Sequence, residues 1–96
     1  MAYDPGAIDA ALAAAVGDEP ALIAELRAAF VDSADKAIGA IERAEDDAAW
    51  TLAASRLKGL AASFGAVRLM SLASETAAKP GDAESVRKLR RAIARL

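Results

Sequence analysis

The chain has 96 residues and contains neither cysteine nor histidine. A chain of this length usually forms one domain, and we expect one domain over residues 1–96. Without cysteine there is no disulfide and no thiolate chemistry, and without histidine there is no imidazole base. A structural zinc site is not expected because its usual ligands are missing, and we expect no metal and no cofactor.

Nothing in the sequence indicates a membrane or export segment. No apolar run approaches the roughly 20 residues that a membrane-spanning helix needs. Residues 1–5 lack a basic segment followed by an apolar one, so no secretory signal is expected. We therefore expect a cytoplasmic protein that does not contact a membrane.

The net charge of -2 combines two halves of opposite sign. Residues 1–55 contain 11 Asp and Glu against 3 Lys and Arg, whereas residues 56–96 contain 3 against 9. One interpretation is that helices of opposite charge pack side by side. The other is a basic patch that binds an acidic partner.

The composition favours helices throughout. Alanine, the best helix former, fills 28 of the 96 positions. No sustained alternation of β-branched and aromatic residues indicates a strand, so we predict an all-α chain. Asp4 and Pro5 predict the start of a first short helix, which Gly17 ends.

A second helix is predicted from Pro20, and its apolar residues extend to Ile41. Gly39 lies inside this helix at a cost of about 1 kcal/mol relative to alanine, and it is expected to allow close packing. The acidic break at residues 45–47 supplies the cap of a third helix, predicted over about residues 47–64. Gly65 is its predicted C-terminal stop.

A fourth helix is predicted over about residues 66–78. The turn at residues 79–81 separates it from a fifth helix, which Asp82 caps. Short connections imply antiparallel neighbours, so we predict an up-down four-helix bundle with an additional short N-terminal helix. The core-facing residues predicted for the last two helices are Val67, Leu69, Met70, Ala73, Ala77, Val86, Leu89, Ile93 and Leu96.

The third predicted helix has two different faces when successive residues are placed about 100° apart. One face is a core stripe that contains Trp50, Ala53, Ala54, Leu57, Leu60, Ala61 and Phe64. The opposite face contains Thr51, Leu52, Ser55, Lys58, Gly59 and Ala62.

This opposite face has an unusual content for a solvent-exposed surface. Leu52 and Ala62 are apolar, and Gly59 costs about 1 kcal/mol relative to alanine in mid-helix. A glycine there allows another surface to approach the backbone closely, and Lys58 places a cation beside Ser55. We interpret the face as a docking surface. An ordinary solvated helix face is the alternative.

Residues 54–66 read Ala-Ser-Arg-Leu-Lys-Gly-Leu-Ala-Ala-Ser-Phe-Gly-Ala. This segment resembles the signature of histidine phosphotransfer (HPt) domains, Ala-His-x-Leu-Lys-Gly followed by Gly-Ala. The resemblance extends over about residues 8–96, and Ser55 stands where the family has its phosphorylated histidine. The signature residues that match are Leu57, Lys58, Gly59, Gly65 and Ala66.

The resemblance implies a helical bundle that takes part in two-component phosphorelay signalling. In the family, the histidine exchanges a phosphoryl group with the aspartate of a receiver domain. The lysine three residues later neutralises phosphoryl charge, and the following glycine leaves room for the receiver. Carried over, Lys58 is the electrostatic partner and Gly59 the clearance residue. The implied partner is a response-regulator receiver domain or a histidine kinase.

Serine is not expected to replace the histidine chemically. Imidazole is a nucleophile at neutral pH, whereas a serine hydroxyl normally needs an adjacent base. Lysine, a cation at neutral pH, is not expected to serve as that base, and no other base is evident on the face of Ser55. A phosphoserine would also be a stable ester rather than a high-energy phosphoramidate.

We therefore predict a pseudo-HPt domain that is not an enzyme and has no catalytic residue. It would act as a docking or regulatory module for receiver domains or histidine kinases. The predicted receiver-docking residues are Leu52, Ser55, Lys58, Gly59 and Ala62.

Two alternatives stay open. The first is that the natural protein has histidine at residue 55 and that serine was substituted for it. The function would then be ordinary phosphotransfer. The second is that Ser55 accepts phosphate from a Ser/Thr kinase, which adds nearly two negative charges to the face. Nucleic-acid binding through the basic last helix is not expected, because the chain is acidic overall and no aromatic residue interleaves with the basic ones.

Overall fold

The computed structural model describes residues 19–96. This range contains helices and no strand, so the all-α prediction is confirmed for it. The predicted first helix lies outside the described residues. The four helices are α2 (Pro20–Glu42), α3 (Asp47–Ser63), α4 (Val67–Ala77) and α5 (Ala83–Ala94).

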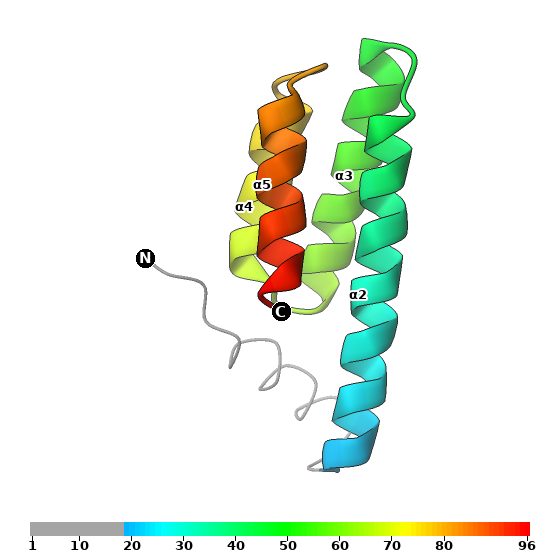
Figure 1. The fold of residues 1–96 in the computed structure, drawn as a ribbon, viewed down its shortest axis with the longest axis vertical. Coiled ribbons are helices and arrows are strands. Elements are labelled where there is room, and N and C mark those ends of the chain that lie inside the picture. The colour runs from blue at the N-terminus through cyan, green and yellow to red at the C-terminus, as the bar shows by residue number, and fades with distance from the viewer. Residues whose placement is uncertain (1–18) are drawn as a thin grey trace.

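The four helices lie side by side, and consecutive helices run in opposite directions (Figure 1). In the described part of the chain, α3 contacts α2 and α4, and α5 contacts the same two helices. The helix α2 is the longest, with 23 residues. Its first turns extend beyond the other helices at the end of the bundle where α3 ends (Figure 1).

Two aspartates begin α3 and α5. The Asp46 carboxylate accepts the backbone N–H of Ala49 at 2.7 Å. The Asp82 carboxylate accepts the Ser85 hydroxyl at 2.6 Å and the Ser85 backbone N–H at 3.3 Å. The bonds from the backbone N–H groups of Ala49 and Ser85 each satisfy a helix N-terminal donor that has no partner within its own helix. Both predicted caps are confirmed.

Gly65 ends α3 as predicted. Its φ of 68° lies in the left-handed region, which glycine adopts without the steric cost that a Cβ brings. The backbone N–H of Ala66 donates to the Ala61 carbonyl at 2.9 Å, and that of Gly65 to the Ala62 carbonyl at 3.2 Å. This pair of bonds is the Schellman motif, and it turns the chain sharply into α4.

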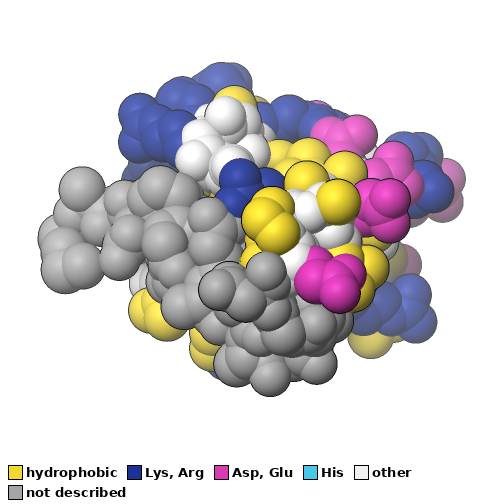
Figure 2. Space-filling model, turned by 90° about the horizontal axis from the view of Figure 1, so that it is seen from below, with side chains coloured by type: hydrophobic (Ala, Val, Ile, Leu, Met, Phe, Trp, Pro, Cys, Tyr) yellow, Lys and Arg dark blue, Asp and Glu magenta, His cyan; other side chains and the backbone are white. Residues whose placement is uncertain are grey.

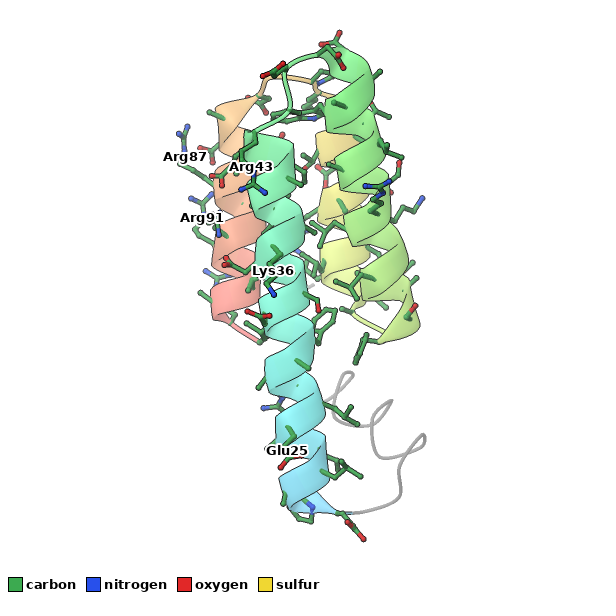
Figure 3. The ribbon with its side chains drawn as sticks, turned by 90° about the vertical axis from the view of Figure 1, so that its right-hand side faces the viewer. Glu25, Lys36, Arg43, Arg87 and Arg91 are labelled. Carbon is green, nitrogen blue, oxygen red and sulfur yellow. The ribbon has the colours of Figure 1, made fainter. Side chains whose placement is uncertain are left out.

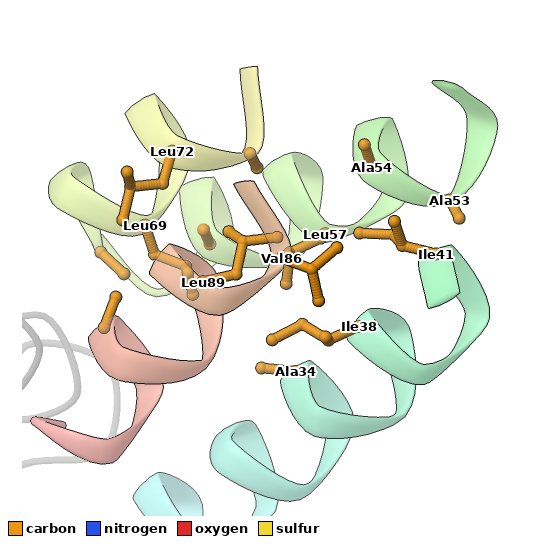
Figure 4. Packing of buried hydrophobic residues seen from close by; sticks show 14 of the residues in the cluster. Ala34, Ile38, Ile41, Ala53, Ala54, Leu57, Leu69, Leu72, Val86 and Leu89 are labelled. Carbon is orange, nitrogen blue, oxygen red and sulfur yellow. The ribbon is translucent and has the colours of Figure 1, made fainter. Parts of the chain in front are cut away.

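All four helices contribute hydrophobic side chains to one core (Figure 4). The Phe30 ring of α2 packs on the Phe64 ring at the end of α3, with centroids 4.6 Å apart. Burial of this apolar surface is the main stabilising contribution, roughly 25 cal/mol for each Å² removed from water. The largest fully buried hydrophobic residues are Phe30, Ile38, Ile41, Leu57, Leu69 and Leu89.

The inward face of α4 differs from the predicted one at Val67. This side chain is 70% exposed, so the prediction that it faces inward is wrong. The buried stripe of α4 follows Leu69, Leu72, Ala73 and Thr76, and Val67 precedes Leu69 by about 200° of helical rotation. The first residue of α4 therefore points away from the core.

Gly39 also has a different role from the predicted one. A Cβ at this position would meet Nη1 of Arg43 at 3.0 Å, and the nearest atoms all belong to Arg43. The missing side chain therefore leaves room for an arginine of the same helix rather than for a neighbouring helix.

Opposite charges face each other between α2 and α5. The Arg90 guanidinium bonds to the Asp35 carboxylate and, at 2.5 Å, to Oε1 of Glu42. The bond to Glu42 is the main reason why the pKa of Arg90 is raised. This arrangement supports the interpretation that the two oppositely charged halves pack side by side.

Figure 3 labels some of the charged side chains of the outer surface. Lys36 and Arg43 lie on the outer side of α2, and Arg87 and Arg91 on the outer side of α5. Arg87 and Arg91 both pair with Glu84 on their own helix. Exposed pairs of this kind contribute little to stability because water and salt screen them.

Candidate functional site

The outer face of α3 is open to solvent, as the helical spacing predicts. Leu52 is 53% exposed and is the large apolar side chain of this face. The opposite side of the helix is buried against the core. The exposed residues, which we call the Ser55 face, are Thr51, Leu52, Ser55, Lys58, Gly59 and Ala62.

Two contacts with α4 fix the rotation of α3. The Trp50 side chain is 8% exposed, and its indole N–H donates to the Thr76 carbonyl at 2.6 Å. The Thr51 hydroxyl donates to the Ala77 carbonyl at 3.4 Å. With Trp50 buried on the core side of α3, Ser55 lies on the outside.

No group in the described part of the chain activates Ser55. Its hydroxyl has no hydrogen bond to any described residue, whereas the Ser63 hydroxyl donates to the Gly59 carbonyl at 3.0 Å. Residues 48–74 contain no Asp or Glu, and the whole chain contains no histidine. The Ser55 face therefore supplies no base that could take a proton from this hydroxyl.

The charged residues that the segment of residues 48–74 contributes are all positive. Arg56, Lys58 and Arg68 are the charged residues between positions 48 and 74. All three are exposed, and none forms an ion pair with a described residue. They differ in this from Arg87, Arg90 and Arg91 of α5, which are paired with carboxylates.

Gly59 has no packing role within the fold. A Cβ at this position would meet no atom within 4 Å. Its backbone is regular helix, so no special backbone conformation requires glycine there. The residue lowers helix propensity by about 1 kcal/mol relative to alanine, and the described fold offers nothing that compensates for this cost.

The residues that carry the family resemblance therefore fall into two groups. Leu57 and Ala66 are fully buried, and Gly65 forms the left-handed turn after α3, so these three have roles in the fold. Lys58 and Gly59 are exposed and have none. The fold therefore does not explain the presence of Lys58 and Gly59, whereas contact with another molecule would.

A shallow groove lies beside the Ser55 face, and the sequence did not predict it. It has a volume of about 410 Å³ between the end of α2 and the start of α3, and Leu52 and Arg56 form part of it. Arg43 of α2 lies on its other side, and Glu45 and Asp46 also line it. Helical periodicity cannot reveal such a groove, because it forms only when α2 packs against α3.

A second cavity, of about 520 Å³, lies where the α2–α3 connection meets the start of α5. Its lining includes the carboxylates of Glu42, Glu45, Asp46 and Asp47. It shares no residue with the Ser55 face. In the described residues, no cluster of His, Cys, Asp and Glu has the arrangement of a metal site.

The family model of the Hpt domain matches residues 10–96. Since this match covers most of the chain, the protein belongs to the Hpt domain family. Comparison with curated proteins finds no match, and comparison with solved structures finds none either.

Hpt domains are modules of phosphorelay signalling. They carry phosphoryl groups rather than act as conventional enzymes, and they interact with receiver domains and histidine kinases. None of the helices between residues 19 and 96 has the length and apolar character required to cross a membrane.

Proposed function

We propose that this protein is an Hpt domain that docks on receiver domains or histidine kinases without carrying a phosphoryl group. The observation that carries the proposal is the Ser55 face, where Lys58 and Gly59 are exposed and have no role in the fold. A cation without a partner and a glycine without a packing contact are both consistent with a surface that binds another protein.

The loss of phosphotransfer follows from the chemistry of residue 55. A histidine on this face would attack phosphorus with a ring nitrogen while the aspartate carboxylate of the receiver leaves. The Ser55 hydroxyl needs a base for the same step, and no described residue supplies one. The docking surface and the acceptor are thus separable, and this chain retains only the first.

Docking is tested by titrating the full chain with receiver domains and kinase domains of the host. We expect Lys58→Ala and Gly59→Leu each to weaken binding to the partner, because the first removes the cation and the second fills the open space over the backbone. The controls are on α5: Lys88→Ala makes the same change as Lys58→Ala, and Ala94→Leu introduces the same side chain as Gly59→Leu, both at exposed positions. If the wild-type chain binds no receiver and no kinase, the proposal is wrong.

The missing acceptor is tested with Ser55→His and a receiver phosphorylated on its aspartate. We expect the histidine variant to accept the phosphoryl group and the serine form to accept none, as measured by phosphate-affinity electrophoresis. Ser55 is exposed, so the substitution should leave the stability of the fold nearly unchanged. Reversible phosphorylation of the serine form would contradict the chemical argument.

The same variant bears on the alternative that residue 55 is histidine in the natural protein. Apart from residue 55, the signature residues Leu57, Lys58, Gly59, Gly65 and Ala66 are all present. An exposed side chain such as that of residue 55 can be exchanged without disturbing the core. These observations are consistent with a natural protein that has histidine at residue 55 and carries out phosphotransfer. The natural gene sequence decides between the two proposals.

A further inference from the structure

The charged residues of α3 that lie closest to Ser55 are positive. Residues 48–74 contain cations and no carboxylate. The nearest acidic residues given for this region, Glu45 and Asp46, line the groove at the start of α3 together with Arg43 and Arg56. Elsewhere the arginines of α5 are largely neutralised by Glu84, Asp35 and Glu42.

Two of the cations flank Ser55 on opposite sides. Around the axis of α3, Arg56 lies about 100° from Ser55 in one direction and Lys58 about 60° in the other. Arg56 lines the groove on the side of α2. Thr51, which lies on the same side as Lys58, bonds to the Ala77 carbonyl of α4. An anion presented to Ser55 would therefore have one cation on each side.

Resting on the docking function, we propose that the Ser55 face binds a receiver domain preferentially in its phosphorylated state and leaves the phosphoryl group in place. Phosphorylation replaces one carboxylate of the receiver by a phosphate group that carries close to two negative charges. The two flanking cations attract the additional charge. The domain then acts as a selective binder of the phosphorylated receiver rather than as a relay.

Retention of the phosphoryl group follows from the same geometry. Ser55 occupies the position from which a nucleophile would attack, and its hydroxyl has no hydrogen-bonded base among the described residues. No bond to phosphorus is formed or broken by the domain. Bound in this way, the receiver keeps its phosphorylated aspartate until it dissociates or until water hydrolyses the acyl phosphate.

The expected preference is about tenfold at low ionic strength, from two cations acting on one added charge at surface distances. It should decrease as salt is added, because the screening length falls from about 30 Å at 0.01 M to about 3 Å at 1 M ionic strength. A preference caused by shape alone would not depend on salt in this way.

The test uses the full chain and a receiver domain that binds it, with Mg²⁺ present and with or without beryllofluoride, a stable mimic of aspartyl phosphate. Dissociation constants are measured for the wild type, for Arg56→Ala/Lys58→Ala and for the control Lys88→Ala. We expect the tenfold preference in the wild type and the control, and its loss in the double variant. Denaturation curves verify that all three proteins are folded.

The possible outcomes separate this inference from the docking function. Equal affinity for both states of the receiver overturns the inference and leaves docking intact, whereas no binding of either state contradicts docking itself. A preference that persists in the double variant shows that Arg56 and Lys58 are not its cause, and it also overturns the inference.

A second measurement tests retention of the phosphoryl group. A receiver phosphorylated with acetyl phosphate is mixed with excess domain, and its phosphorylated fraction is followed over time. We expect the serine form to leave the half-life of the acyl phosphate unchanged or longer, and Ser55→His to shorten it by transfer to the imidazole. A shorter half-life with the serine form would refute retention.

Discussion

Replacing Gly59 by alanine should make the protein more stable. A Cβ at residue 59 meets no atom within 4 Å, so the substitution adds no clash and removes no contact. Alanine favours a helix interior over glycine by about 0.8–1.0 kcal/mol, in part because glycine has more freedom in the unfolded chain. We therefore expect the free energy of unfolding to rise by about 1 kcal/mol and Tm by about 4–8 °C.

Gly81→Ala is the matched control. A Cβ at residue 81 also meets no atom within 4 Å, but Gly81 has a φ of 82°. An alanine there is forced into the left-handed region, at a cost of about 1–2 kcal/mol. The two substitutions make the same chemical change in equally open surroundings, and they should shift stability in opposite directions.

Urea denaturation followed by tryptophan fluorescence measures both variants. Trp50 is the single tryptophan of the chain and is buried, so its emission reports on the core. The midpoint should move while the slope stays constant, which indicates a change in stability and not in the surface exposed on unfolding. If Gly59→Ala lowers stability, the open, regular helix described at this position is refuted.

Three further predictions concern the fold. Val67→Ala should change the free energy of unfolding by less than about 0.5 kcal/mol, whereas Leu69→Ala should lower it by about 2–5 kcal/mol; similar values from calorimetry would contradict the exposed position of Val67. Asp46→Ala should lower it by about 1 kcal/mol through loss of the cap on α3, and an unchanged urea midpoint would show that the cap contributes nothing. Bonds to the Ser85 hydroxyl and to Arg87 lower the pKa of Asp82 and of Glu84, respectively. Their contribution to stability is therefore present above the unfolded pKa values near 4 and lost as the pH falls through the lower folded values. Asp82→Asn/Glu84→Gln should thus flatten the acid limb of a plot of Tm against pH, and an unaltered limb would exclude this contribution.

The features that depend on residues close together in the sequence could be predicted from it. The cap Asp82, a cap within residues 45–47 and the stop at Gly65 were predictable, because each depends on bonds or backbone angles within a few residues of its own position. The two faces of α3 were also predictable, since the stripe from Trp50 to Phe64 follows one helical period over four turns.

The errors arose where the local pattern was too short or had two explanations. Val67 stands at the first position of α4, where one valine does not indicate a direction and the long-range packing of Leu69 and Leu72 sets the rotation of the helix. A glycine inside a helix, such as Gly39, often marks a place where a second helix packs closely. Here the group that lies over it is the side chain of Arg43. A glycine in a sequence shows that space is needed and does not show what fills it.

The sequence by itself determined that the chain is helical, where its described helices begin, and that no histidine is available at the position of Ser55. Only the tertiary structure decided that Lys58 and Gly59 have no role inside the fold. It also decided that Arg90 joins α5 to α2 and that a groove lies between the end of α2 and the start of α3. The physical reason is that helix propensity, caps and periodicity act between neighbours in sequence. Whether a side chain lacks a partner depends on every helix that packs around it.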